Sequence, residues 1–178
     1  APVAKRATTL GVTSGQGSYL IDESGRKVLD FASGVAVCNI GHNHPKVVEA
    51  IQAQTKELIH AGHNVVYYES YVALAERLTA LNGPDSMVYF SNSGAEANDG
   101  AIKLAKYVTK RHAIISFKSS FHGRTIGAMS LTASSAAYRK NYGTMPDVYF
   151  LDYPNVYRDP FVDGRLNAHY FNQFDALF

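Results

Sequence analysis

The chain has 178 residues, 46% of them hydrophobic, and a formal net charge of +2 at pH 7. This length and apolar content exclude a disordered chain and are sufficient for a folded domain with a core. The basic residues are scattered, which excludes the concentrated basic patch of a nucleic-acid-binding protein, and no apolar run is long enough to span a membrane. The single cysteine, Cys38, cannot form an internal disulfide, so we expect a reducing, cytoplasmic compartment.

The N-terminal part of the sequence predicts an irregular arm and then a β-hairpin. Residues 1–17 have no clear period and contain three glycines. Apolar, β-prone runs at 19–21 and 27–31 flank the turn cluster 22–26, in which a glycine can adopt a positive φ. Residues 32–44 show no regular pattern, and we expect them to be irregular.

Two helices are predicted next. The first has Pro45 in its first turn, where the missing N–H costs nothing, and ends near Gly62. The second covers residues 69–81 and is stopped by Gly83 and Pro84.

The second half of the sequence alternates predicted strands with predicted helices. Continuous apolar runs predict buried strands at 87–90, 113–117 and 147–151. Helices are predicted after residue 93, from about residue 124 and from about residue 167. This alternation is typical of an α/β fold with a parallel sheet and right-handed crossovers, in which ligands bind at the carboxyl ends of the strands.

The stretch Ser91–Asn98 is predicted to be an anion-binding turn. It follows the run at 87–90 and leads into an amphipathic helix, so the first backbone N–H groups of that helix lack intrahelical partners and lie at the positive end of its dipole. Gly94 permits close approach of a phosphate, and the hydroxyls of Ser91 and Ser93 are further donors. An ordinary helix cap is the alternative, because Ser93 and Glu96 also fit a capping box.

A second loop, 118–123, carries a different set of groups. The aromatic ring of Phe121 can lie against a planar heterocycle, and the guanidinium of Arg124 matches a carboxylate. A phosphate seat, a stacking ring and a carboxylate-binding arginine suit pyridoxal 5'-phosphate and an amino-acid substrate.

Four motifs follow one another along the chain. They are Gly41-His42-Asn43-His44-Pro45, Ser93-Gly94-Ala95-Glu96-Ala97-Asn98, Ala101-Ile102-Lys103-Leu104-Ala105 and Phe121-His122-Gly123-Arg124-Thr125. In order and spacing they resemble the class III (ω-amino-acid) aminotransferases, which are pyridoxal-phosphate enzymes of fold type I. The resemblance extends from about residue 17 to at least residue 158. It implies an α/β chain with an N-terminal arm and hairpin segment at 1–44 and, at 45–178, the first part of the mostly parallel-sheet, cofactor-binding large domain.

The resemblance also implies site residues. The cofactor would be held by Ser93, Gly94 and Ala95 at its phosphate and by Phe121 and His122 at its pyridine ring. Arg124 would bind a substrate carboxylate.

The substrate is implied by Val35. It occupies a position where 4-aminobutyrate enzymes carry an aliphatic residue and ornithine aminotransferases a tyrosine, which favours an ω-amino acid without an α-carboxylate. The segments 145–149 and 153–155 also resemble the 4-aminobutyrate branch. The expected reaction transfers the amino group to a 2-oxo acid such as 2-oxoglutarate. Acetylornithine aminotransferase is the alternative within the family.

The family's catalytic groups are expected beyond Phe178. These are the Schiff-base lysine, which also moves a proton, and the aspartate that binds the pyridine nitrogen. We therefore expect the 178-residue polypeptide to be an N-terminal fragment that is inactive alone. Lys118 lies in a loop where a substitute Schiff-base lysine is conceivable, but a solvated surface lysine is the simpler interpretation.

The histidines of the sequence invite interpretation as a metal site. The pairs His42 with His44 and His60 with His63 are not expected to bind a metal, because no carboxylate is suitably spaced with them. A non-catalytic, phosphate-binding α/β module is the alternative to an enzyme. The family resemblance implies a homodimer, and no nucleic-acid or membrane partner is expected.

Overall fold

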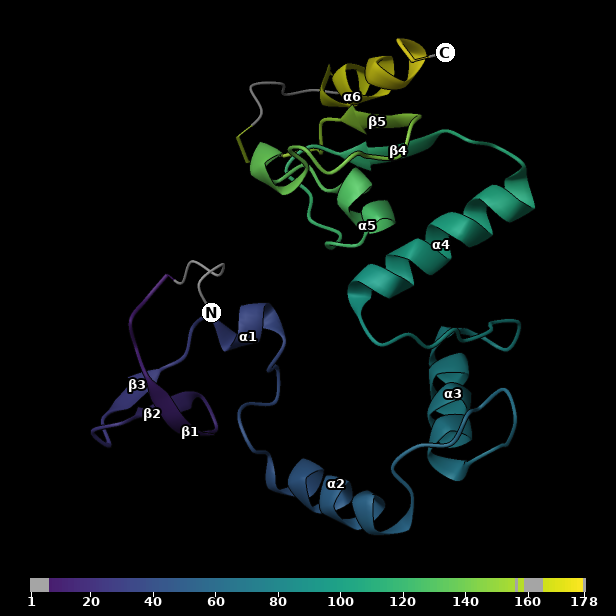
Figure 1. Ribbon diagram of the computed structural model, residues 1–178. Coiled ribbons are helices and arrows are strands. Elements are labelled where there is room, and N and C mark those ends of the chain that lie inside the picture. The colour runs from purple at the N-terminus through teal and green to yellow at the C-terminus, as the bar shows by residue number, and fades with distance from the viewer. Residues whose placement is uncertain (1–6, 156, 159–164, 178) are drawn as a thin grey trace. The chain divides into compact units, whose positions relative to one another are not determined.

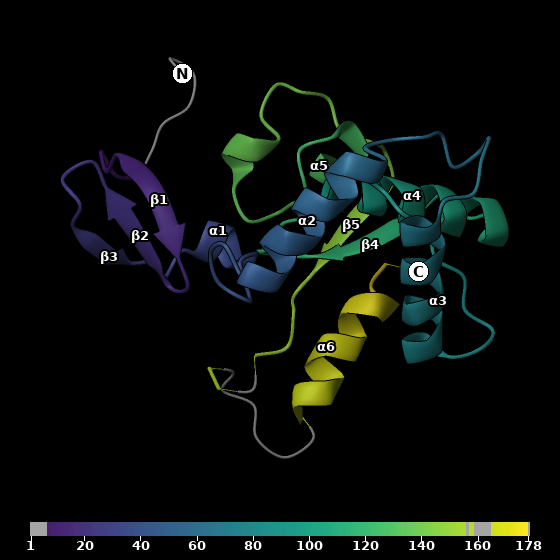
Figure 2. The same ribbon diagram turned by 90° about the horizontal axis from the view of Figure 1, so that it is seen from below.

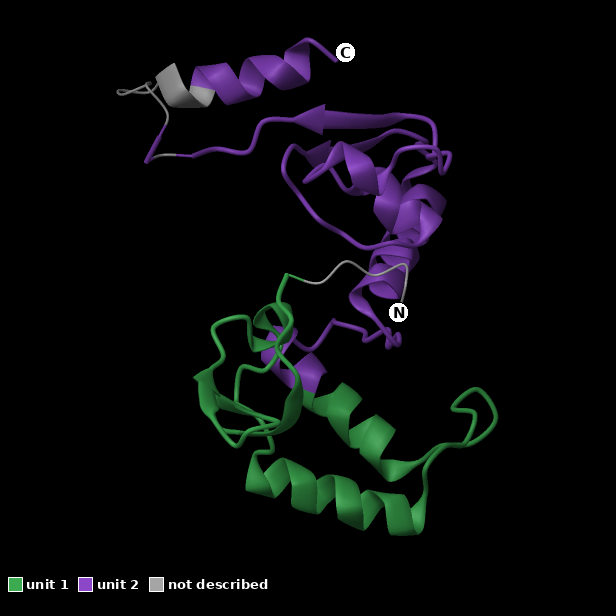
Figure 3. Ribbon diagram, turned by 60° about the vertical axis from the view of Figure 1, so that its left-hand side comes forward, with its two compact units in different colours: residues 1–77 green, residues 78–178 purple. Residues whose placement is uncertain are grey.

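The computed structural model describes residues 7–155, 157–158 and 165–177, and it divides the chain into two compact units (Figure 3). The units are residues 1–77 and 78–178, and their boundary falls inside helix α3 (Glu69–Asn82). Each unit is described below by itself. The predicted division into an arm and hairpin segment at 1–44 and a large-domain part at 45–178 stays a prediction.

The first unit contains a three-stranded antiparallel sheet, visible side by side in Figure 2, with the order β1-β2-β3. Its strands are β1 (Val12–Gln16), β2 (Tyr19–Asp22) and β3 (Lys27–Leu29). The predicted hairpin is therefore confirmed. The prediction of an irregular arm over 1–17 is wrong for β1, because this glycine-containing segment finds a partner in β2, where Gly15 pairs with Leu20. Residues 1–6 lie outside the described part of the chain.

The stretch after the sheet contains one short turn and two helices, the second of which crosses the boundary between the units. The turn α1 (Ser33–Ala36) is not a right-handed helix, because Gly34 has φ 63° and Val35 has φ 65°. Helix α2 (Pro45–Glu57) begins at the predicted proline but ends at Glu57, earlier than Gly62, because Leu58 is extended. Helix α3 matches its predicted range to within one residue.

The second unit is built on a pair of parallel strands (Figure 1). Strand β4 (Ile114–Phe117) pairs with β5 (Val148–Leu151), with Ile114 opposite Val148. Helix α4 (Gly94–Thr109) packs on α5 (Ile126–Leu131), α5 contacts β4, and α6 (Arg165–Asp175) contacts β5. A 3-10 turn, η1 (Ala136–Tyr138), follows α5. The predicted parallel pairing of these two strands is confirmed.

The predicted strand at 87–90 is not formed. Residues 87–90 are not assigned to any strand, and Met87 and Tyr89 have exposed fractions of 98% and 74%. A β-prone run becomes a strand only where another strand pairs with its backbone, and β4 and β5 are the only strands described in this unit. The turn at 91–95 therefore does not leave a strand, whereas the loop at 118–123 does follow β4.

The core of the second unit surrounds α5. Among the described residues, the buried apolar side chains of the chain are Ile102, Ala128, Met129, Leu131 and Leu151. Two buried hydroxyl groups, one in α5 and one directly after it, are hydrogen-bonded to the helix backbone. Ser130 donates to Ile126 O, and Thr132 donates to Ala128 O. No helix in the described ranges combines the length and apolar character needed to cross a membrane.

Candidate functional site

The N-terminus of α4 is capped as the sequence predicts. Ser93 is the N-cap residue, and its Oγ accepts a hydrogen bond from the backbone N–H of Glu96 at 3.3 Å. The carboxylate of Glu96 accepts from the backbone N–H of Asn92 at 2.7 Å, one residue before the usual capping-box partner. The cap leaves the hydroxyl hydrogen of Ser93 available to a ligand, because Ser93 Oγ acts only as an acceptor here.

The same turn has the properties of a phosphate seat. Within the described residues, no group accepts a hydrogen bond from the backbone N–H of Gly94 or Ala95, which are the first two residues of a 16-residue helix. Nothing lies within 4 Å of the position that a Cβ on Gly94 would occupy, so the space above this residue is open. Two free donors, an open face and the positive end of a helix dipole fit a phosphate group.

The loop after β4 is hydrogen-bonded to α4 through the backbone carbonyl of His122. The side-chain amide of Asn98 donates to His122 O at 2.7 Å, and His122 N–H donates to Oγ1 of Thr132 at 3.0 Å. Thr132 is completely buried. Both backbone polar groups of His122 are therefore hydrogen-bonded, the carbonyl to α4 and the N–H to the residue that follows α5.

The imidazole of His122 is oriented by a buried serine. Ser116 Oγ lies 2.8 Å from Leu131 O, to which it donates, and 3.4 Å from Nε2 of His122. Because the only hydroxyl hydrogen of Ser116 points to Leu131 O, Ser116 can only accept from His122. In the tautomer with hydrogen on Nε2, this contact is a hydrogen bond from His122 to Ser116.

The aromatic and cationic groups of the loop form a small cluster. Phe121 meets Tyr138 edge to face, with ring centroids 5.7 Å apart, and retains an exposed fraction of 56%. The guanidinium of Arg124 lies 3.8 Å from the ring centroid of Tyr138 and 5.8 Å from that of Phe121. Arg124 forms no ion pair within the described ranges, so its planar donors remain available to a carboxylate.

Val35 lies in the first unit. It sits in the left-handed turn α1 and has an exposed fraction of 89%. Beside it, the backbone N–H of Ser33 and then the side chain of His42 hydrogen-bond to Asp30, and together they lower the pKa of the Asp30 carboxyl below its usual value.

Lys118 lies at the end of β4 and forms a salt bridge of 2.8 Å with Asp152. Its side chain has an exposed fraction of 59%. Among the described residues, no group of three or more His, Cys, Asp and Glu side chains is placed to hold a metal ion.

The structure adds residues to the site that the sequence alone did not indicate. Asn98 belongs to a motif that the sequence showed, but its link to His122 joins residues that are 24 positions apart. Thr132 and Tyr138 follow α5 in a stretch without any sequence signal. The site residues at 93–95 and 121–124 are brought together within the second unit, while Val35 belongs to the first.

Comparison with known proteins identifies the family. The family model for class III aminotransferases matches residues 1–177, and the chain therefore belongs to this family. The mixed helices and sheet fit the α/β, fold type I architecture of its structural neighbours.

Two relatives illustrate the range of names in the family. The chain is 43% identical over 149 residues to a protein of Bacillus subtilis (strain 168) named "probable 4-aminobutyrate aminotransferase", covering 82% of this chain and 34% of the relative. It is 45% identical over 138 residues to the acetylornithine aminotransferase of Halalkalibacterium halodurans, covering 78% of this chain and 35% of the relative. The chain thus spans about a third of the length of these relatives.

A solved structure with a similar fold carries the expected cofactor. The taurine:2-oxoglutarate aminotransferase from Bifidobacterium kashiwanohense, in complex with PLP and glutamate, superposes with a TM-score of 0.86 and 29% sequence identity. The match covers 99% of this chain and 41% of that one. Family membership and PLP-bound neighbours imply pyridoxal 5'-phosphate as the cofactor, and the free N–H groups and open face at Gly94 fit its phosphate.

Proposed function

We propose that residues 1–178 form the N-terminal part of an enzyme that transfers the amino group of an ω-amino acid, most specifically 4-aminobutyrate, to a 2-oxo acid such as 2-oxoglutarate. The observation that carries this proposal is the joining of two loops: the phosphate seat at 93–95 and the loop at 121–124 are linked by the hydrogen bond from Asn98 to His122 O. One loop offers donors for a phosphate and the other offers a ring and a guanidinium.

Each residue has a distinct part in this proposal. Ser93, Gly94 and Ala95 bind the phosphate through one hydroxyl and two backbone N–H groups. Phe121 and His122 hold the pyridine ring. Bound pyridoxal phosphate supplies an electron sink for the bonds at the substrate's amino-bearing carbon.

Substrate binding is assigned to two other residues. Arg124 binds a substrate carboxylate, because it keeps free planar donors while its flat face rests on Tyr138. Val35 contacts the substrate as an exposed aliphatic side chain and favours an amine-bearing carbon without a carboxylate. Acetylornithine aminotransferase is the second candidate, favoured by the name of the Halalkalibacterium halodurans relative.

The remaining catalytic groups are proposed to lie outside residues 1–178, so that this polypeptide is inactive by itself. These are the lysine that binds the cofactor covalently and the aspartate that contacts the pyridine nitrogen. The ion pair of Lys118 with Asp152 supports this proposal, because it engages the lysine of the loop at 118–123. We further propose a cytoplasmic homodimer and a domain division at 44/45.

The first test locates the covalent lysine. The full-length protein is incubated with pyridoxal phosphate, reduced with borohydride, digested and mapped by mass spectrometry. We expect one pyridoxyl group on a lysine outside residues 1–178, with the Lys118→Arg variant labelled equally. Labelling of Lys118 itself would overturn the assignment of the lysine, and the absence of any labelled lysine would favour a non-catalytic phosphate-binding module.

The second test identifies the substrate. Glutamate formation from 2-oxoglutarate is measured with 4-aminobutyrate and with N-acetylornithine in parallel. We expect the larger kcat/KM with 4-aminobutyrate, whereas a larger value with N-acetylornithine would decide for the second candidate. The 178-residue polypeptide serves as the control and is expected to produce no glutamate.

A further inference from the structure

The turn that carries Val35 has an unusual backbone. Ser33, Gly34, Val35 and Ala36 have φ values of 48°, 63°, 65° and 62°, so four consecutive residues are left-handed. Three of them carry a Cβ, which makes this conformation unfavourable, and Val35 is also β-branched. Such a turn persists only where its surroundings hold it, and segments of this kind cluster at functional sites.

Asp30 holds the start of the turn. Its Oδ1 accepts hydrogen bonds from the backbone N–H groups of Ala32 at 3.0 Å and Ser33 at 2.9 Å. Its Oδ2 lies 2.8 Å from Nε2 of His42, and the Asp30 side chain has an exposed fraction of only 8%. The Asp30 carboxylate therefore connects the backbone of Ala32 and Ser33 to the side chain of His42, which is twelve positions from Asp30.

His42 is itself fixed to the sheet. Its backbone N–H donates to Gly17 O at 2.7 Å, and its carbonyl accepts from Gly17 N–H at 3.0 Å. Its ring lies against Gly15, where a Cβ would come within 2.9 Å of the imidazole Cγ. The approach is also close at Gly41, where a Cβ would lie 2.9 Å from the backbone carbon of Gly17.

Asp30 is tied to the turn between β1 and β2, as His42 is. Its backbone N–H donates to Ser18 O at 2.9 Å. The chain between Asp30 and His42 is thus closed into a loop whose ends are both tied to residues 17 and 18. Val35 is the large apolar residue of the left-handed turn in this loop, and its side chain is exposed.

We propose that Asp30 and His42 are positioning residues that hold residues 33–36 in the left-handed conformation and thereby present Val35 to the substrate. This inference rests on the proposed function, because it takes Val35 as a substrate-contacting residue. The pair acts through the backbone of the turn and does not itself touch the substrate. Substrate selection then depends in part on the Asp30 carboxylate and the His42 imidazole, although neither group contacts the substrate.

The experiment measures turn structure and substrate choice separately in the full-length protein. Backbone amide hydrogen exchange over residues 32–38 is followed by mass spectrometry in the wild type, Asp30→Ala and His42→Ala. The matched control is Asp22→Ala, because Asp22 also accepts backbone hydrogen bonds, from Ser24 and Arg26, and pairs with Arg26, but in the β2–β3 turn. The ratio of kcat/KM for 4-aminobutyrate to that for N-acetylornithine is measured on the same proteins.

We expect exchange over residues 32–38 to rise about tenfold in Asp30→Ala and His42→Ala, and the substrate ratio to change by about tenfold. Asp22→Ala should raise exchange only around residues 22–27 and leave the ratio unchanged. Asp30→Asn and His42→Gln, which keep hydrogen-bonding groups, should recover part of both effects. These two variants also provide the measurement if the alanine variants do not fold.

Three results would overturn the inference. Unchanged exchange over 32–38 would mean that the pair does not hold the turn. Raised exchange with an unchanged substrate ratio would mean that the turn does not serve substrate selection. If the wild type turns over neither substrate, the proposed function and the substrate part of this inference fail together, while the exchange data still report whether the pair holds the turn.

Discussion

Gly123 packs directly against Ala95. A Cβ placed on Gly123 would lie 2.5 Å from the Cβ of Ala95 and 2.9 Å from its Cα, so not even a methyl group fits between the two residues. Gly123 also has φ 141°, a conformation that residues with a side chain rarely adopt. This contact brings the loop after β4 against the first turn of α4, and so joins the two halves of the candidate cofactor site.

The first prediction follows from this contact. Gly123→Ala should lower the free energy of unfolding by about 2 kcal/mol or more, because overpacking adds to the cost of the positive φ. It should also weaken pyridoxal-phosphate binding, measured by fluorescence titration. The control is Gly143→Ala, since Gly143 has φ 68° but nothing within 4 Å of its Cβ position, so it should cost about 1 kcal/mol and leave binding unchanged. Equal effects of the two variants would contradict the importance of the contact.

The second prediction concerns the buried hydroxyl of Thr132. Thr132→Val removes the acceptor of the His122 N–H and should destabilise the protein by about 1–3 kcal/mol, because a buried donor loses its partner. Cofactor affinity should fall as well, since the His122 backbone is less firmly held. Thr109→Val, which removes an exposed hydroxyl bonded to Ala105 O, should change stability by about 0.5 kcal/mol or less. Denaturant unfolding and cofactor titration of both variants check this comparison.

The third prediction tests the guanidinium of Arg124. Arg124→Lys keeps the charge but loses the planar pair of donors, so we expect the KM for 2-oxoglutarate to rise about tenfold with a smaller change in kcat. Arg139→Lys is the matched control, because Arg139 also lies over an aromatic ring, 4.7 Å from the centroid of Phe150. Steady-state kinetics should show a normal KM for the control. A similar rise in both variants would argue against carboxylate binding by Arg124.

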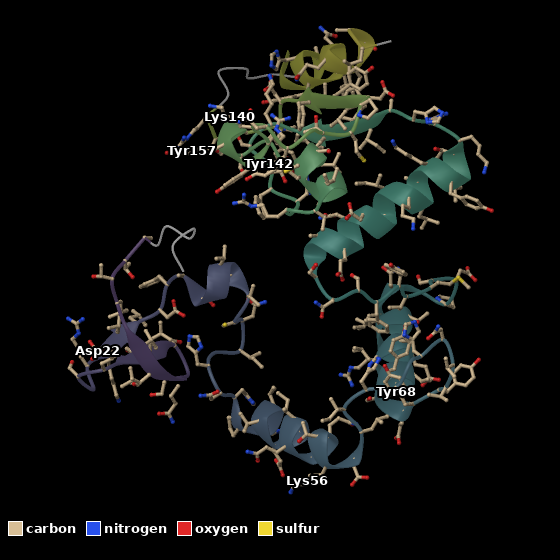
Figure 4. All side chains as sticks on the ribbon, viewed as in Figure 1. Asp22, Lys56, Tyr68, Lys140, Tyr142 and Tyr157 are labelled. Carbon is tan, nitrogen blue, oxygen red and sulfur yellow. The ribbon has the colours of Figure 1, made fainter. Side chains whose placement is uncertain are left out.

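The fourth prediction concerns the pH dependence of the hairpin around Asp22, labelled in Figure 4. The hydroxyl of Ser24, together with backbone N–H groups of Arg26 and Ser24 and the Arg26 side chain, lowers the pKa of Asp22 from 3.8 to about 2. Because the folded-state pKa is the lower one, the stabilisation is present above pH 3.8 and is lost as the pH falls towards 2.

Unfolding experiments on the wild type and Asp22→Asn between about pH 6 and about pH 2 check this sign. The wild type should be the more stable protein at the higher pH, and the difference should shrink as the pH is lowered. A difference that grows on acidification would show that the carboxylate form is not the stabilising one.

Local patterns in the sequence were sufficient for several elements. The helices α2, α3 and α4, the hairpin of β2 and β3, and the parallel strands β4 and β5 all follow runs of apolar residues with the expected period. The cap at Ser93 also follows from a four-residue pattern. For the helices and the hairpin, the hydrogen-bonding partners and the caps lie within the element or next to it. For β4 and β5, the two apolar runs share one clear pattern.

The remaining features depend on residues that are distant in the chain. Strand β1 forms because β2 offers a partner, while the β-prone run at 87–90 is not a strand in the described part of the chain. The left-handed turn at 33–36 is held by Asp30 and His42, and no local preference of its residues predicts it.

The family and the chemical types in the site were thus determined by the sequence, because motifs and residue chemistry are local properties of the chain. How the site is assembled was decided only by the tertiary structure. The contact of Gly123 with Ala95 and the hydrogen bonds of the His122 backbone to Asn98 and Thr132 join separate segments, and such close approaches are set by packing rather than by any one stretch of sequence.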